Sequence, residues 1–87
     1  MKIKQGFILR NVAGNNVVVP VGEATIDFNG MMSLNETGAF LFEKMIEGTT
    51  KEQLIEQLMS QYEIDADTAK NDVEEFIEKV KKENLFE

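Results

Sequence analysis

The sequence has no cysteine and no histidine, and it has one proline and one tyrosine. Without cysteine the chain can form no disulfide, no thiolate zinc site and no cysteine nucleophile. Without histidine it lacks the commonest general base and metal ligand, so any chemistry would depend on carboxylates, hydroxyls, lysines and one tyrosine. These two absences argue against an enzyme.

Long hydrophobic runs are also missing. The longest, Val17 to Val21, is far shorter than a membrane span, and the first six residues lack the apolar core of a signal peptide. We therefore expect a cytoplasmic protein with no membrane partner.

Length and composition indicate one small globular domain. The chain has 87 residues, of which 43% are hydrophobic and 29% charged. This is ordinary globular composition, so residues 1–87 should fold alone around a single modest core. The formal net charge of −7 argues against a nucleic-acid surface, which requires clustered lysine and arginine, and favours a peptide or protein partner.

The first third of the chain has the pattern of a β-hairpin. Phe7–Val12 and Val17–Val21 are rich in β-branched and large apolar residues, and between them lies Ala13–Asn16, a cluster that tolerates left-handed backbone angles. Pro20 cannot donate a hydrogen bond to a neighbouring strand, so we expect it near the end of the second strand.

A third strand is predicted over Ala24–Asn29. Ala24, Ile26 and Phe28 would share its buried face, because side chains alternate between the two faces of a strand. Thr25, Asp27 and Asn29 would take the wet face. The result is a three-stranded antiparallel meander with this strand at one edge. In the connector that follows, Met31 and Met32 could form an adaptable apolar contact surface, but core filling is favoured.

Two helices are expected to follow the sheet. The first runs from Asn35, a good N-cap, to about Glu47, and its many apolar residues make it the most buried helix. Gly48 ends it. The second is capped by Thr49 or Thr50 and stops near residue 63.

The third helix begins after Asp65, a plausible N-cap, and is amphipathic. Its apolar side consists of Ala66, Ala69, Val73, Phe76, Ile77 and Val80. Asn84 can adopt the left-handed conformation past its end, so that Leu85 and Phe86 fold back onto the core. Three strands followed by three helices predict an α+β fold of the winged helix-turn-helix type.

Candidate chemistry is sparse. Carboxylate pairs such as Asp72 with Glu75 and Glu74 with Glu78 lie on the polar side of the third helix, which favours a solvated face over an acid–base pair. There is no phosphate-binding glycine loop and no serine elbow. We predict no catalytic residue, no cofactor and no metal.

Several short motifs carry a resemblance to a known family. They are Leu34-Asn35-Glu36-Thr37-Gly38-Ala39, Glu47-Gly48-Thr49-Thr50, Leu54 to Leu58, Tyr62 and Asp72-Val73-Glu74-Glu75-Phe76-Ile77. In their order and spacing the chain resembles the PqqD-like family, named for pyrroloquinoline quinone biosynthesis. Gly38 is a departure, since the family usually has alanine there.

The resemblance implies a recognition element for ribosomally made, post-translationally modified peptides. Such a domain acts as a peptide chaperone: it binds the leader of a precursor peptide as an added strand beside strand three, against helix three, and presents it to a modifying enzyme, often a radical SAM protein. The predicted peptide-binding residues here are Ala24, Thr25, Ile26, Asp27, Phe28, Val73, Phe76, Ile77 and Val80.

Other functions stay open at this point. A winged-helix transcriptional regulator would use the third helix to read DNA, although that helix carries more acidic than basic residues. An enzyme or maturase subunit with its own active site has no nucleophile or base to recommend it. The protein could be a monomer, or a homodimer that pairs through the edge of the third strand.

Overall fold

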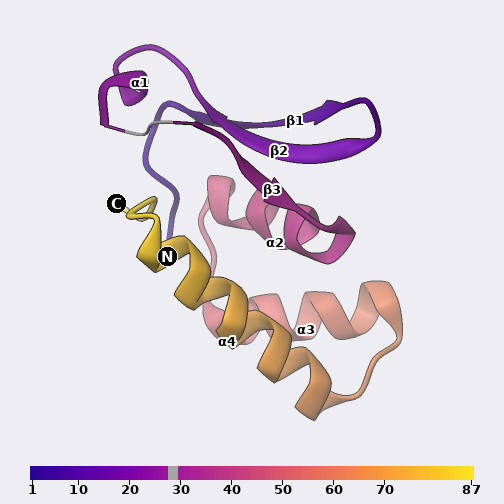
Figure 1. Cartoon of the computed structure of the whole chain (residues 1–87). Coiled ribbons are helices and arrows are strands. Elements are labelled where there is room, and N and C mark those ends of the chain that lie inside the picture. The colour runs from indigo at the N-terminus through magenta and orange to yellow at the C-terminus, as the bar shows by residue number, and fades with distance from the viewer. Residues whose placement is uncertain (28–29) are drawn as a thin grey trace.

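The computed structural model describes residues 1–27 and 30–87. The elements of this part of the chain are shown in Figure 1: β1 (Phe7–Val12), β2 (Asn15–Pro20), α1 (Ala24–Asp27), β3 (Met32–Leu34), α2 (Glu36–Glu47), α3 (Lys51–Tyr62) and α4 (Ala66–Lys82). The strands form one antiparallel sheet in the order β1-β2-β3. The predicted α+β fold, a three-stranded antiparallel sheet followed by helices, is confirmed.

The hairpin between β1 and β2 is confirmed and has a two-residue turn. Val12 pairs with Asn15, and the turn residues Ala13 and Gly14 both have positive φ, 52° and 84°. Positive φ at both positions is the pattern of a type I′ turn, whose twist matches that of the strands. Pro20 is the last residue of β2, as predicted.

The prediction of a strand over Ala24–Asn29 is wrong for its first four residues. Ala24–Asp27 form the short helix α1, while Phe28 and Asn29 lie outside the described residues. The turn that starts at Gly22 continues into a helical turn, because the N–H of Thr25 and its hydroxyl both donate to the Gly22 oxygen, at 3.2 and 2.8 Å. The local hydrogen-bonded turn therefore determines the conformation of Ala24–Asp27, although these residues alternate as in a strand.

The third strand is Met32–Leu34, in the segment that was predicted to be a connector. It pairs with β2 alone among the described strands, with Ser33 opposite Val17. Met32 and Leu34 are buried on the core side and Ser33 between them is exposed. β3 is thus a short edge strand. Core filling by Met32 is confirmed, but the same prediction for Met31 is wrong, since Met31 is 68% exposed.

Helix α2 is the centre of the molecule, with the sheet on one side and α3 and α4 on the other (Figure 1). It begins where Asn35 Oδ1 accepts the Gly38 N–H at 2.7 Å, and it ends at Gly48. Its buried residues are Gly38, Ala39, Leu41, Phe42 and Met45. The prediction that this helix is the most buried is confirmed.

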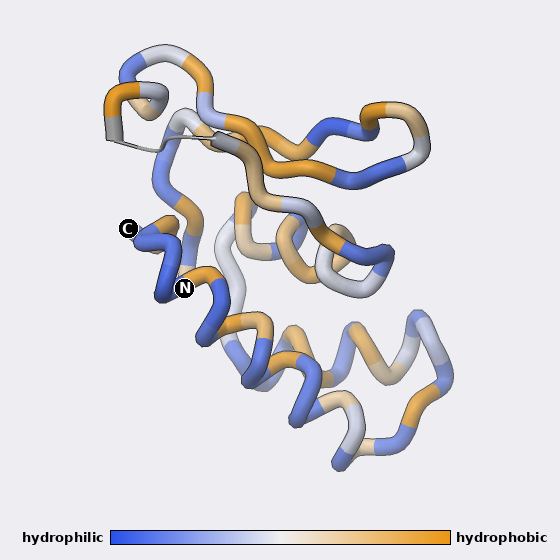
Figure 2. Tube along the Cα trace, in the orientation of Figure 1, coloured by the Kyte–Doolittle hydropathy of each residue, from blue (hydrophilic) through white to orange (hydrophobic). Residues whose placement is uncertain are grey.

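The other two long helices also begin at local caps. Thr50, and not Thr49, caps α3, since its hydroxyl accepts the Gln53 N–H at 3.2 Å. Asp65 caps α4, accepting the Thr68 N–H at 2.7 Å. Figure 2 shows polar and apolar residues alternating along α4, and the apolar ones pack into the shared core.

The two ends of the chain pair with each other at the end of α4. Asn84 has a φ of 57°, and Leu85 beyond it is fully buried, as predicted. Phe86 forms a β-bridge with Ile3. The C-terminal tail thus lies beside the N-terminal segment and not along β3. Across residues 1–27 and 30–87, no helix combines the length and the hydropathy that crossing a membrane requires.

Candidate functional site

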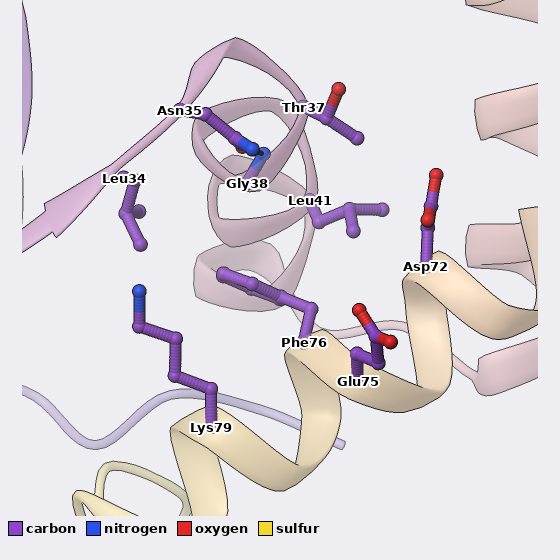
Figure 3. A pocket seen from close by; sticks show the side chains of 9 residues that line it. All are labelled: Leu34, Asn35, Thr37, Gly38, Leu41, Asp72, Glu75, Phe76 and Lys79. Atoms are coloured by element: carbon purple, nitrogen blue, oxygen red, sulfur yellow. Dashed lines mark hydrogen bonds between the residues drawn. The ribbon is translucent and has the colours of Figure 1, made fainter.

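A pocket of about 350 Å³ lies where the end of β3, the first turns of α2 and the middle of α4 meet (Figure 3). Its lining residues are Leu34, Asn35, Thr37, Gly38, Leu41, Asp72, Glu75, Phe76 and Lys79. On α4 the four contributing residues are spaced i, i+3, i+4 and i+7, which places them on one face of the helix. The pocket is large enough for one or two side chains, and its volume lies at the low end of the range for small-molecule sites, roughly 300–1,000 Å³.

The floor of the pocket is apolar. It consists of Leu34, Leu41 and Phe76, which are 8%, 1% and 8% exposed. Gly38 lies beneath the Phe76 ring: a Cβ atom at residue 38 would be 3.2 Å from Cε1 of Phe76. The absence of a side chain at Gly38 therefore lets the ring lie close to α2.

The rim of the pocket is polar and carries charge of both signs. Asp72 and Glu75 line it beside α2, and Lys79 lines it beside β3 (Figure 3). Lys79 reaches across to the sheet, where its Nζ donates a hydrogen bond to the backbone oxygen of Ser33 at 3.2 Å. Strand β3 and helix α4 thus face each other across a gap that one lysine side chain spans.

The open edge of β3 borders this pocket. Antiparallel pairing to β2 uses one edge of the strand, and no other described strand pairs with β3. An unpaired edge presents backbone N–H and C=O groups to an added chain. We refer to the pocket together with the open edge of Met32–Leu34 as the β3–α4 groove.

The predicted residues on α4 fall into two groups in the structure. Phe76 lines the groove. Val73 and Val80 are fully buried in the core, and Ile77 is half-buried and packs against the core. Their apolar spacing marked the inward side of the helix, whereas the groove is lined by the adjacent strip that includes Asp72, Glu75 and Lys79.

The predicted residues before β3 lie elsewhere. Ala24, Thr25 and Ile26 belong to α1, and none of them lines the groove. Ala24 instead lines a second pocket of about 560 Å³, with Lys4, Gln5, Phe7, Glu23, Glu83 and Asn84. Ile26 is 81% exposed. Asp27 is the last residue of α1, and Phe28 lies outside the described residues.

Sequence reasoning missed every groove residue except Phe76: Leu34, Asn35, Thr37, Gly38, Leu41, Asp72, Glu75 and Lys79. One signal was present: Met32-Ser33-Leu34 alternates apolar, polar, apolar immediately before the N-cap Asn35. Three residues are too few for periodicity to identify a strand without knowledge of its partner.

The described carboxylates with a shifted pKa, Asp65 and Glu74, lie outside the groove. A carboxylate that acts as a general acid needs a raised pKa. Among the described carboxylates the pKa shifts are downward, at Asp65 because it accepts the Thr68 N–H and at Glu74 because Lys51 donates to it at 2.5 Å. No group of three potential metal ligands occurs within residues 1–27 and 30–87.

Comparison with known proteins yields one family and two structures. The family described as "Coenzyme PQQ synthesis protein D (PqqD)" matches residues 11–85. TbiB1, solved in complex with the TbiA(beta) leader peptide, is similar with a TM-score of 0.76 and 18% identity, over 100% of this chain and 95% of that chain. Lasso peptide synthetase B1, complexed with the leader peptide, is similar with a TM-score of 0.72 and 15% identity, over 97% of this chain and 93% of that chain.

At these identities the structural likeness establishes the fold alone. No curated protein matches the chain in sequence.

Proposed function

The chain belongs to the PqqD family, and on that basis we propose that it is a peptide-binding accessory protein for a ribosomally synthesised precursor peptide. The leader of the precursor would bind in the β3–α4 groove, adding a strand to the open edge of β3 with its side chains against α4. The observation that carries the proposal is the open strand edge directly beside a pocket with an apolar floor.

The two similar structures support a peptide as the ligand. Both are complexes with leader peptides, and both match this chain and their own chains over more than nine-tenths of the length. The net charge of −7 also suits a peptide better than a nucleic acid. Helix α4, which a winged-helix regulator would insert into a groove of DNA, exposes Asp67, Glu75 and Glu78 beside its lysines.

Backbone pairing alone would not give useful affinity. Each added hydrogen bond contributes about 0.5–1.5 kcal/mol, while ordering each residue of a flexible leader costs about 1–2 kcal/mol. These terms roughly cancel, so affinity has to come from side chains that enter the pocket. Burying one Leu-sized or Phe-sized side chain on the floor of Leu34, Leu41 and Phe76 contributes about 1.5–3 kcal/mol.

In this proposal the protein performs no bond-making of its own. The groove holds the leader, and a separate modifying enzyme acts on the remainder of the precursor. The family resemblance suggests that this enzyme is a radical SAM protein. The absence of cysteine and histidine is in keeping with this division of labour.

The test is a titration of ¹⁵N-labelled protein with synthetic leader peptides from short open reading frames next to its gene. We expect amide shifts at Met32–Leu34, at the start of α2 and along Asp72–Lys79, with a scrambled peptide as control. Shifts around α1 instead would place the binding site there and contradict the β3–α4 groove. If no leader causes shifts at high micromolar concentration, the proposal of peptide binding is wrong.

A further inference from the structure

The ammonium group of Lys79 is bonded to the backbone of another element and not to a described carboxylate. Its Nζ donates to the Ser33 backbone oxygen at 3.2 Å, on the edge strand, 46 residues away in sequence. Among the described residues no carboxylate oxygen lies within 4.0 Å of this ammonium, although Glu75 and Glu78 are nearby on the same helix. Its charge is therefore held by a neutral carbonyl.

The opposite end of the groove has the opposite charge. Asp72 is half-buried and Glu75 exposed, and neither is in an ion pair with another described residue. From residue 72 to residue 79 the helix advances about 10 Å. An extended chain rises about 3.3 Å per residue, and every second side chain lies on the same face. Guest residues two and four positions apart are therefore about 7 and 13 Å apart, which brackets the distance along α4.

A guest strand on β3 competes with Lys79 for the Ser33 oxygen. Edge carbonyls of a strand accept backbone N–H groups from an added chain, so the guest can satisfy Ser33 and release the ammonium. A released ammonium gains most from an ionised acceptor, since a charge-assisted hydrogen bond is about twice as strong as a neutral one. The exchange is then favourable for a guest that brings a carboxylate to this position.

We propose that Lys79 is a specificity determinant of the β3–α4 groove: it leaves Ser33 when a peptide binds and pairs with an acidic side chain of that peptide. Asp72 and Glu75 bind a basic side chain of the same peptide, two or four residues from the acidic one. An apolar residue of the peptide, between its acidic and basic residues, enters the pocket. This inference rests on the proposed function, because it assumes that a peptide occupies the groove. It names the substrate class as peptides with one acidic and one basic residue in a fixed arrangement about an apolar anchor.

The test is a display selection that needs no knowledge of the natural precursor. Random peptides of about twelve residues, long enough to exceed the ~10 Å between the charged ends, are selected on wild-type protein, Lys79→Met, the Asp72→Asn/Glu75→Gln pair and Lys82→Met. Methionine keeps most of the lysine stem and removes the ammonium. Lys82 is an exposed lysine on the same helix that does not line the groove, so it serves as the matched control.

We expect wild-type protein and Lys82→Met to select peptides with an acidic residue at a fixed offset from the apolar anchor. These peptides should also carry a basic residue two or four positions from the acidic residue. Lys79→Met should lose the acidic preference only, and Asp72→Asn/Glu75→Gln the basic preference only. For the best peptide, replacing its acidic residue by the amide should weaken wild-type binding about two- to fivefold at low salt and leave Lys79→Met binding nearly unchanged.

The outcomes separate this inference from the function on which it rests. Peptides with an apolar anchor but no acidic position, or an acidic preference that survives in Lys79→Met, overturn the role of Lys79 and leave peptide binding standing. If neither wild type nor any variant enriches a peptide, both proposals fail. Thermal melting of each variant confirms that the proteins compared are folded.

Discussion

The ring of Phe76 lies against the one residue of α2 that has no side chain. A Cβ on Gly38 would be 3.2 Å from Phe76 Cε1 and 3.1 Å from Asn35 Oδ1, both tighter than ordinary van der Waals contact. Asn35 Oδ1 also accepts the Gly38 N–H at 2.7 Å, so it is not free to move away. Gly38 thus sets how deeply Phe76 sits in the groove.

Gly38→Ala should weaken peptide binding with little net effect on stability. The added methyl improves helix propensity by about 1 kcal/mol, and crowding against Phe76 costs at least about 1 kcal/mol, so these two terms oppose each other. Outward movement of Phe76 narrows the pocket, and we expect roughly fivefold weaker binding of a peptide selected as above. Fluorescence anisotropy and urea denaturation measure the two effects.

Gln57→Ala, at an exposed position of α3, is the control for Gly38→Ala. If the Gly38 variant binds as tightly as the control, the crowding at Phe76 is relieved elsewhere and Gly38 does not limit the pocket.

Val73→Ala and Phe76→Leu should separate the core from the groove. Val73 is fully buried, and its truncation should lower the free energy of unfolding by about 2 kcal/mol. Binding by the folded fraction should change less than about twofold, since Val73 does not line the pocket. Phe76→Leu should cost less than about 1.5 kcal/mol in stability yet weaken binding about fivefold. The reverse ranking in a combined denaturation and binding measurement would place the peptide contact on Val73.

Ala13→Asn should stabilise the hairpin. Ala13 has a φ of 52°, a left-handed conformation that alanine adopts at a cost of about 1–2 kcal/mol and asparagine tolerates better. The substitution creates an Asn-Gly turn, so the free energy of unfolding in urea should rise by about 0.5–1 kcal/mol. Ala66→Asn makes the same change at an exposed helical residue and should slightly lower the free energy of unfolding. Equal effects at both positions would contradict the turn assignment.

Acid should weaken the fold partly through Glu74. The hydrogen bond from Lys51, at 2.5 Å, holds the Glu74 pKa below its ordinary value of 4.5. The unfolded chain therefore takes up this proton first as the pH falls. The stabilisation is complete above the unfolded pKa and is lost as the pH falls through the folded one.

Glu74→Gln should therefore lower stability near neutral pH and flatten its decline in acid. Urea denaturation between about pH 6 and pH 3 measures this slope. Glu56→Gln, at an exposed position with no ion pair among the described residues, should leave the slope as in wild type. A Glu74 variant with the wild-type slope would show that the contact with Lys51 adds nothing in solution.

The helical half of the molecule could be predicted from sequence because its determinants are local. Asn35, Thr50 and Asp65 each accept a backbone N–H three residues ahead, so the signal and its partner lie within one turn. The left-handed Asn84 and the buried Leu85 follow from the same short-range rules.

The groove could be predicted only in part. Phe76 was identified because its spacing placed it on the apolar side of α4. Lys79, Asp72 and Glu75 were assigned to a solvated face, since sequence does not reveal that β3 and α2 lie alongside that strip.

The sequence by itself determined the class of fold, the hairpin, the ends of the three long helices and an acidic chain without cysteine or histidine. The local turn at Gly22 accounts for the helical conformation of Ala24–Asp27, and tertiary structure alone decided that Met32–Leu34 pairs with β2 as the edge strand. The alternating pattern of Ala24–Asn29 is longer than that of Met32–Leu34, but Ala24–Asp27 is helical after the turn at Gly22, and Met32–Leu34 is the strand that pairs with β2. The physical reason is that strand pairing and pocket formation depend on residues distant in sequence, whereas helix caps and turns depend on near neighbours.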